Sequence, residues 1–522
     1  MQLSDRPELP GPVAAVLRSI QAKGVSLWSQ GGQLRYRAPK GALASEEIEL
    51  LRSAKNQIAQ LLEVSADRPA GTPVELARRP HRDHAPLAFS QWAHWRLYDL
   101  SQRASLCVSA SAFRLLGELQ MDAFCKSVAE IVRRHDALRT QIIIRDGVPR
   151  QEIAIDGIPE IAVDDLTALG ERAQALEVRR RIEMLVLHPI DLATDPLFRI
   201  RLLELRCDEH VLIVTFEHII TDATSKSLFI QELLQAYDQA STGCAFELPE
   251  IAVQFADYAY WQNQILAHWL RQHGPYWETR LSGSRRLAFP ETSVRSNSVA
   301  LGFSSVPIRI DSDLKRELQA WCNAHRTTLA LGVFTIFAAL ILRWCHTADG
   351  VFRYQVDGRA TPALQNAIGY FASKLLLRVQ IEPRDRFADV LERVMAEYCT
   401  AYEHFDFSYL ESSAQPSEVA ASSLFNWVPR KLKSNAADRS RPRGAIEAIP
   451  VPFDYLGLRY LDLDWDPSIL LYDTDEEIVG AVEFPLSRFS TASMEHFAHN
   501  FLTWLRAIPR KPELLVHDLP MM

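Results

Sequence analysis

The chain has 522 residues, of which 48% are hydrophobic and 23% charged, and this composition predicts a globular protein of two or three domains. The formal net charge of −8 argues against nucleic-acid binding through general attraction to phosphate. The seven cysteines show no Cys-x-x-Cys pair and no short Cys/His cluster, so we interpret them as buried thiols in a reducing cytosol, not zinc ligands. No secretory signal is visible, and the longest uncharged apolar segment, residues 329–342, is shorter than the roughly 20 residues of a membrane span. We therefore expect a cytoplasmic protein with no metal, nucleic-acid or membrane partner.

The first sixty residues predict a small unit made of a helix, a β-hairpin and a second helix. Residues 12–22 have helical spacing, with apolar side chains on one face. Residues 25–30 and 33–37 are predicted strands on either side of a Gly-Gly turn, which supplies the positive φ angles of a tight hairpin. Residues 45–63 predict the second helix, which starts at a capping serine. Because so small a unit buries little surface, we expect it to present a surface to a partner.

This N-terminal unit is locally basic although the whole chain is acidic. Between residues 11 and 55 the acids are Glu46, Glu47 and Glu49, and the basic residues outnumber them. The basic residues are Arg18, Lys23, Arg35, Arg37, Lys40, Arg52 and Lys55. An acidic peptide could add to the hairpin edge as a further strand. The alternative interpretation is a solvated basic face on an N-terminal cap.

The segment GVSLWSQGGQLRYRAPKGAL, followed by a helix rich in Leu and Glu, closely resembles the β-hairpin docking domains at the N-termini of nonribosomal peptide synthetase proteins. The resemblance covers about residues 11–63. It implies that the unit captures a short linear motif at the C-terminus of an upstream carrier protein. We therefore assign residues 1–63 to a docking domain. Its expected docking residues are Trp28, Arg35, Arg37, Lys40, Arg52 and Lys55.

Residues 64–85 are predicted to be a linker, because prolines and a glycine among mixed charges do not sustain a helix or a central strand. Helices and strands alternate beyond it, which indicates an α/β or α+β body. Its first half predicts helices at 90–100, 121–133, 171–187 and 225–239, and strands at 141–145, 197–204 and 211–216. Asp146-Gly147 predicts a hairpin turn after the first of these strands.

The second half of the body repeats this mixture. It predicts strands at 306–310, 351–357, 469–476 and 478–484, and helices at 313–325, 329–344, 387–402 and 491–507. Similar size and content indicate two related lobes, which we place at residues 86–265 and 266–522. No internal sequence repeat supports this division.

Several motifs of the body resemble, in the same order, those of one family. LAFSQWAHWRLYDL is similar to its opening motif, RRHDALRT to its second, FADYAYWQ to its fourth and IGYFASKLLLRV to its fifth, and EHIITDA lies where that family carries HHxxxDG. The family is the condensation domain of nonribosomal peptide synthetases, and the match runs from about residue 86 to the C-terminus. The resemblance implies an α/β fold in which two chloramphenicol-acetyltransferase-like lobes form a V-shaped pseudodimer, with a tunnel that carrier-bound substrates enter from opposite faces.

The chain ends shortly after the last predicted helix, so we expect neither an adenylation domain nor a carrier domain with a serine for phosphopantetheine. It also contains no phosphate-cradling glycine loop, and no bound cofactor is expected. The expected protein is free-standing, and its substrates arrive on the phosphopantetheine of partner carrier proteins. The acceptor is either a free small molecule or a group on a second carrier.

His218 is the expected catalytic residue. Strand alternation places Leu212, Val214, Phe216 and His218 on one face, at the point where an apolar strand gives way to a polar turn. A lone histidine at such a place is more often a hydrogen-bonded core residue. Its position matches the second histidine of HHxxxDG, however, which the family uses as a base or to position the nucleophile. The resemblance therefore favours a catalytic role.

Asp222 and Arg359 are expected to shape the site rather than to react. Asp222 precedes a predicted helix and is a good N-cap residue. In the related family this aspartate pairs with an arginine, and Arg359 matches that arginine by its place upstream of IGYF. We predict an ion pair between Asp222 and Arg359 that bridges the lobes, with the charged groups within about 4 Å.

Two residues of the focal segment depart from the family motif. Glu217 replaces the first histidine, and alternation directs it away from His218, although its charge could favour the imidazolium form of that residue. Ala223 replaces the glycine and adds a Cβ where a backbone amide could stabilise an oxyanion. Restoring histidine at 217 and glycine at 223 should raise transfer if these changes are decay, and lower it if they are adaptation to an unusual acceptor.

The sequence thus predicts an acyltransferase that moves a carrier-bound acyl or peptidyl thioester onto an amine or hydroxyl, giving an amide or ester in a step that could also release the chain. The alternative is a non-catalytic platform that recruits carriers or tailoring enzymes. An epimerase-like or cyclising relative is a third interpretation, but the paired aspartates of cyclising members are absent from the sequence, and nothing indicates epimerisation.

Overall fold

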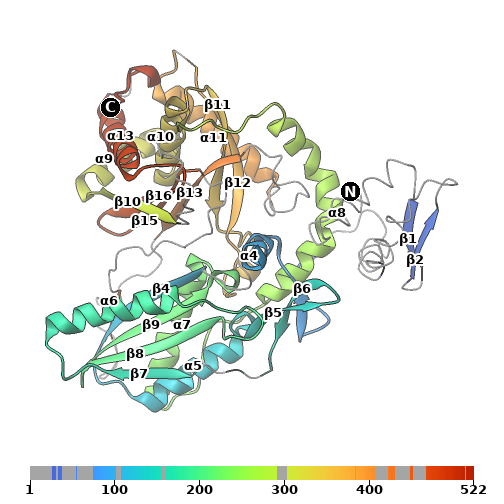
Figure 1. Ribbon diagram of the computed structural model, residues 1–522, viewed down its shortest axis with the longest axis vertical. Coiled ribbons are helices and arrows are strands. Elements are labelled where there is room, and N and C mark those ends of the chain that lie inside the picture. The colour runs from blue at the N-terminus through green and yellow to red at the C-terminus, as the bar shows by residue number, and fades with distance from the viewer. Residues whose placement is uncertain are drawn as a thin grey trace.

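The computed structural model places two α/β lobes one above the other, with a β-hairpin near the N-terminus (Figure 1). The structure describes residues 26–30, 33–37, 55, 75–100, 107–155, 157, 160–290, 302–382, 384–405, 421–429, 447–450, 466–511 and 513–521. In the hairpin, β1 (Ser26–Gln30) pairs antiparallel with β2 (Gln33–Arg37), which confirms the predicted strands and turn position. Apart from Lys55, which is helical, the two helices predicted around the hairpin lie outside the described residues.

The N-terminal lobe is built on a five-stranded sheet in the order β14-β4-β9-β8-β7. Its strands are β4 (Val108–Leu116), β7 (Ile161–Asp165), β8 (Phe198–Arg206), β9 (Glu209–Glu217) and β14 (Glu447–Pro450). Helix α6 (Glu171–Leu187) packs on one face of the sheet. Helices α5 (Met121–Arg134) and α7 (Ala223–Ser241) pack on the other face.

Strand β9 positions the focal segment. It pairs antiparallel with β4 on one side and β8 on the other, and every one of its residues is buried. Val211 and Ile213 pack in the cluster under α6, whereas Leu212, Val214 and Phe216 pack in the cluster under α5 and α7. The predicted alternation therefore holds along the strand, and a strand held on all sides fixes where the chain emerges at Glu217.

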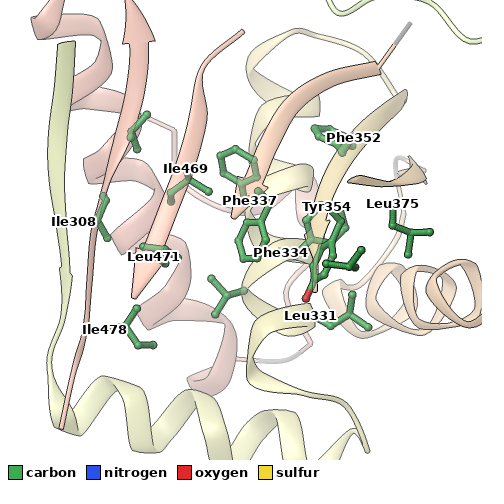
Figure 2. Packing of buried hydrophobic residues seen from close by; sticks show 14 of the residues in the cluster. Ile308, Leu331, Phe334, Phe337, Phe352, Tyr354, Leu375, Ile469, Leu471 and Ile478 are labelled. Carbon is green, nitrogen blue, oxygen red and sulfur yellow. The ribbon is translucent and has the colours of Figure 1, made fainter. Parts of the chain in front are cut away.

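The C-terminal lobe is built on a six-stranded sheet in the order β10-β16-β15-β13-β11-β12. Its strands are β10 (Phe303–Ile310), β11 (Asp349–Val356), β12 (Ser373–Gln380), β13 (Ala421–Pro429), β15 (Ser468–Asp473) and β16 (Ile478–Pro485). Its helices are α9 (Ser312–Ala324), α10 (Leu329–Trp344), α11 (Phe387–Glu403) and α13 (Thr491–Arg510). Phe334 and Phe337 of α10 pack into the core against Tyr354 and Phe425 of the sheet, as Figure 2 shows for the first three.

Two segments connect the lobes. Helix α8 (Phe255–Leu281) starts beside the small sheet of the N-terminal half, and near its other end Arg280 bonds Glu397 of α11 at 2.8 Å (Figure 1). The lobe boundary predicted at 265/266 therefore falls inside one continuous helix and is corrected. Strand β14 comes from the second half of the chain but pairs antiparallel with β4 of the N-terminal lobe. The lobes are thus joined by a helix and by an exchanged strand.

The small sheet has the order β3-β6-β5 and contains β3 (His84–Pro86), β6 (Val148–Ile153) and β5 (Thr140–Arg145). Asp146 and Gly147, with φ of 52° and 80°, form the predicted turn between β5 and β6. Arg79 is buried and donates to Asp257 at 2.7 Å and to Asp136 at 3.0 Å. The segment predicted as a linker thus contributes an edge strand and a buried ion-pair network to the folded body.

The remaining elements are helix α4 (Phe89–Leu100) and the short 3-10 turns η2 (Asp136–Arg139), η3 (His218–Ile220), η4 (Pro362–Leu364) and η6 (Val516–Asp518). Of the seven cysteines, all free, Cys107, Cys322 and Cys345 are buried and the other four are exposed, so the expectation of buried thiols is wrong for those four. Among the described residues no single helix is long and apolar enough to cross a membrane. Helices α9 and α10 reach that length and apolarity only when taken together, across a bend of 98°.

Candidate active site

The focal segment forms two consecutive caps. Strand β9 ends at Glu217, whose carboxylate accepts a hydrogen bond from the backbone N–H of Ile219 and so caps the turn η3. Helix α7 then begins at Ala223, and Asp222 caps it by accepting from the backbone N–H of Ser225 at 2.7 Å. His218 lies at the start of the turn between these caps. Its backbone is fixed further by a hydrogen bond from its N–H to the carbonyl of Cys107, at 2.8 Å.

The hydrogen bond of the His218 ring defines its tautomer. Nδ1 lies 2.8 Å from the backbone oxygen of Thr221. A carbonyl oxygen only accepts hydrogen bonds, so Nδ1 carries the hydrogen. In the neutral ring Nε2 then has the free lone pair. This is the arrangement that a general base needs.

Two other rings enclose His218. His94 of α4 is 6% exposed and its ring centroid lies 5.0 Å from that of His218. Tyr370, which lies between β11 and β12, has its ring centroid 4.8 Å from that of His218 and 4.9 Å from that of His94. The three rings come from three separate parts of the chain and form one cluster across the two lobes.

Burial keeps the two imidazoles neutral. It lowers the pKa of His218 to about 4, and the positive charge of Lys226 acts in the same direction. The Thr221 carbonyl and Asp222 oppose this lowering, and Lys374 adds the smallest effect, which again lowers the pKa. Burial also holds the pKa of His94 well below its usual range. At neutral pH His218 is therefore uncharged and its Nε2 is able to accept a proton.

The predicted ion pair between Asp222 and Arg359 is confirmed. The two arginine nitrogens lie 2.9 and 3.2 Å from the two carboxylate oxygens, and the arginine side chain is fully buried. Asp222 Oδ2 also accepts from the backbone N–H groups of Phe371 and Ala372, at 3.0 and 3.2 Å. The pair joins α7 of the N-terminal lobe to the segment between β11 and β12 of the C-terminal lobe.

Ser225 and two glycines complete this connection. The Ser225 hydroxyl accepts from Arg359 at 2.7 Å and lies 2.8 Å from the carbonyl oxygen of Gly369. A Cβ on Gly369 would lie 2.2 Å from Cγ of Phe255, and a Cβ on Gly358 would lie 2.2 Å from the carbonyl oxygen of Phe371. Only glycine fits at these two positions, because the backbone of the segment runs so close to its neighbours.

The structure corrects one expectation about Glu217. Its carboxylate accepts from the backbone N–H of Ile219 and so caps η3. The pKa of His218 is lowered, not raised, so the imidazolium form that Glu217 was expected to favour is disfavoured. Ala223 is the first residue of α7 and directly follows the N-cap residue Asp222. Whether its Cβ affects catalysis stays a prediction.

The expected docking residues are described only in part. Register pairs Trp28 with Arg35, and Ser26 with Arg37, across the hairpin. Lys55 is helical and exposed. Lys40 and Arg52 lie outside the described residues. A common docking surface therefore stays a prediction.

Sequence reasoning does not find His94 and Tyr370, whose rings lie next to that of His218, or the two lysines whose charges lower its pKa, Lys226 and Lys374. Lys374 lies on β12 with its Nζ 5.9 Å from the Tyr370 ring centroid. Lys226 lies in the first turn of α7, where the helix dipole disfavours a cation. A lysine at the start of a predicted helix is therefore unusual, and the sequence alone shows it. His94 and Tyr370 come near His218 only through tertiary folding. The described residues contain no group of three or more His, Cys, Asp or Glu that could hold a metal ion.

Comparison with protein families agrees with this architecture. The model described as "Condensation domain" matches residues 81–522, and that described as "TubC N-terminal docking domain" matches residues 13–63. The chain therefore belongs to the condensation domain family of nonribosomal peptide biosynthesis, with a docking domain at its N-terminal end. The predicted family and fold class are both confirmed.

Known proteins give the same result. The chain is 29% identical to the isonitrile lipopeptide synthase of Mycobacterium tuberculosis over 87% of this chain and 18% of that protein. It is 26% identical over 446 residues to a chondramide synthase of Chondromyces crocatus, which is 85% of this chain and 11% of that protein. The chain thus spans less than a fifth of either relative. Among solved structures, the X-domain in complex with OxyB from teicoplanin biosynthesis superposes with a TM-score of 0.71 at 21% identity, over 87% of this chain and 99% of that one.

Proposed function

We propose that this protein is a condensation-type acyltransferase that moves an acyl or peptidyl group from a carrier-protein thioester onto an amine or hydroxyl. The observation that carries the proposal is the state of His218. Its ring is neutral, it is oriented through Nδ1 by the Thr221 carbonyl, and its Nε2 lone pair is left for a proton. Membership of the condensation domain family supplies the reaction class.

The reaction balances with this one histidine. The nucleophile attacks the thioester carbonyl, so that a C–N or C–O bond forms and the C–S bond breaks. The proton of the nucleophile passes to Nε2 of His218 and then to the departing thiolate of the phosphopantetheine arm. General base catalysis of this kind contributes roughly 10²–10⁴-fold. A hydroxyl acceptor depends on it more than an uncharged amine does, because a neutral alcohol is the weaker nucleophile.

Other residues of the site have supporting roles. Asp222 and Arg359 hold the start of α7 against the segment that carries Tyr370, and so keep His218 at the junction of the lobes. The N-terminal unit would bind the C-terminal tail of the donor carrier, with the basic residues Arg35, Arg37 and Lys55 attracting an acidic motif. The phosphopantetheine belongs to the carrier and is a substrate of this protein.

The proposal is tested by intact-protein mass spectrometry of the acyl-loaded carrier that the docking domain binds, incubated with an acceptor. Wild-type protein should convert the acyl-carrier to free carrier, whereas His218→Ala should slow this conversion by at least about a hundredfold. His499→Ala changes an exposed histidine of α13 and serves as the matched control, with wild-type rates expected. Equal rates for His218→Ala and wild type would refute the catalytic assignment.

A second candidate is a non-catalytic platform. Glu217 in place of the first histidine of the motif, and the structural similarity to an X-domain solved in complex with OxyB, favour it. A platform would bind an acyl-carrier or a tailoring enzyme and leave the thioester intact. The same mass spectra distinguish the two functions, because a platform leaves the mass of the loaded carrier unchanged while still co-eluting with it in gel filtration.

A further inference from the structure

We propose that His94 of α4 is a positioning residue for acyl transfer. Its ring, together with that of Tyr370, holds the ring of His218 in the orientation in which Nε2 meets the nucleophile. This inference rests on the proposed function, because it assigns a further residue to the same reaction. His94 acts through His218 and does not itself touch the substrate.

Helix α4 is attached to both segments that flank the site. It lies between the two lobes (Figure 1). The Ser90 hydroxyl donates to the backbone carbonyl of Tyr370 at 2.8 Å, and the Gln91 side chain donates to the backbone carbonyl of Ile219 at 2.9 Å. Both donor side chains are buried. Residues three and four positions apart on a helix share a face, so His94 is directed towards the same two segments as Gln91 and Ser90.

The rings of His94, Tyr370 and His218 pack against one another. The His94 ring makes an angle of 57° with the His218 ring and of 82° with the Tyr370 ring, at centroid separations of 5.0 and 4.9 Å. The Tyr370 ring is tilted by 50° to the His218 ring at 4.8 Å. Aromatic rings attract each other in such tilted and edge-on arrangements at centroid separations of about 4.5–7 Å. His94 and Tyr370 are 6% and 4% exposed, so neither ring has room to move away.

A single hydrogen bond does not fix the orientation of the His218 ring. The bond from Nδ1 to the Thr221 carbonyl holds one corner, about which the ring could still tilt. The rings of His94 and Tyr370, which come from α4 and from the segment before β12, block that tilt. The base is therefore held in place by distant parts of the chain as well as by its own turn.

The orientation of His218 sets the rate of proton transfer. A functional side chain works when it is held within roughly 0.5 Å of its productive position, and a misplacement of about 1 Å can cost about a hundredfold in rate. Burial holds the pKa of His94 well below its usual range, so this ring is uncharged at neutral pH. His94 thus acts as a neutral, flat ring, and another aromatic ring of similar size should replace it.

Three substitutions at residue 94 test this role in acyl transfer by the full-length protein. His94→Ala removes the ring and should lower kcat by about ten- to a hundredfold, with KM within about twofold of the wild-type value. His94→Leu keeps most of the bulk but not the flat faces, so it should fold even if the alanine variant does not, and it should lower kcat by at least about fivefold. His94→Phe restores a ring and should keep kcat within about threefold of wild type.

Tyr98→Phe is the matched control. It removes the hydrogen bond from the Tyr98 hydroxyl to Asp191, at 2.8 Å, one turn further along α4. This change loosens the same helix without removing a ring from the cluster around His218. The variant should therefore retain the wild-type kcat at a temperature at which all variants are folded.

A second measurement reports on His218 without turnover. In protein labelled with an NMR-active isotope at the histidine ring nitrogens, a nitrogen that carries hydrogen is distinguished from one that does not. The His218 signals are assigned by their loss in His218→Ala. Wild type should show one neutral tautomer, with the hydrogen on Nδ1. His94→Ala and His94→Leu should shift the two nitrogen signals towards each other, because a tilted ring populates both tautomers, whereas His94→Phe should match wild type.

Wild-type kcat in both His94→Ala and His94→Leu, or a raised KM with unchanged kcat, would overturn the inference. It would also be overturned if His94→Phe were as slow as His94→Leu, because the ring would then act through its nitrogens. If the wild type transfers no acyl group while His94→Leu still changes the His218 signals, the contact between the rings is supported and the proposed function alone is contradicted.

Discussion

Replacement of Asp222 by Asn tests the connection between the lobes, because it removes one charge and changes almost no volume. Oδ2 accepts from Arg359, Phe371 and Ala372, and Oδ1 from Arg359 and Ser225. Whichever way the amide is turned, its NH₂ group faces at least two hydrogen-bond donors. Arg359 is also left buried with only Asp357, at 2.8 Å, as a charged partner.

Breaking a buried ion pair costs about 3–5 kcal/mol, and the remaining contact with Asp357 places the expected loss near the lower end, at about 3 kcal/mol. Urea unfolding followed by tryptophan fluorescence measures it, with Arg359→Gln and the double variant completing a mutant cycle. The coupling energy between the two sites should reach at least about 2 kcal/mol. A loss below about 1 kcal/mol for Asp222→Asn, with no coupling, would refute the account of this network.

Three further predictions follow from the same geometry. Because the folded pKa of His218 is about 4 and its ordinary value is 6.5, the unfolded chain binds a proton that the folded chain does not. The free energy of unfolding should thus fall by about 3 kcal/mol more in wild type than in His218→Gln as the pH drops from 6.5 to 4, and parallel pH profiles would contradict this. Glu217→Ala removes the cap of η3 and should lower the free energy of unfolding by about 1 kcal/mol. The His218 pKa measured by NMR should stay near 4, and an altered pKa would show that Glu217 acts on the ring. Gly358→Ala should cost about 2 kcal/mol in urea unfolding because its Cβ meets a backbone oxygen at 2.2 Å, whereas Gly274→Ala in α8, with nothing within 4 Å, should not destabilise.

Elements with a strong local pattern could be predicted closely from the sequence. Residues 329–344 and 171–187 were predicted as helices and form α10 and α6 with the same bounds. Their apolar periodicity is long enough to define both ends. The Gly-Gly hairpin and the Asp146-Gly147 turn could be predicted, because few residue types favour the positive φ angles that such turns need.

Elements that depend on distant partners were missed. Strand β12 was not predicted, because buried strands read as continuous apolar runs that a helix could also explain. Strand β14 is short and finds its partner β4 more than 300 residues away, which no local pattern encodes. Helix α8 was not predicted, and it passes through both Gly274 and Pro275, since packing overrides local propensity.

Site residues that belong to sequence motifs were predicted, whereas site residues that approach from distant elements were not. His218, Asp222 and Arg359 were found through a motif, and the structure confirms the ion pair between the last two. His94 and Tyr370 were not found, because they approach His218 only when α4 and the segment before β12 meet at the junction of the lobes. The charge state of His218 could not be predicted from the sequence either, because it depends on burial and on two lysines from different elements.

The central claim is that neutral His218 accepts the proton of the nucleophile, and the pH dependence of single-turnover acyl transfer to an uncharged hydroxyl acceptor tests it most directly. A hydroxyl does not titrate in this range, so the profile reports the protein. The rate should stay on its plateau from pH 7 down to about 5 and fall only around the His218 pKa of about 4, and His218→Ala should be slow throughout. A midpoint at the ordinary histidine value of 6.5, or a rate that His218→Ala leaves unchanged, would contradict the claim.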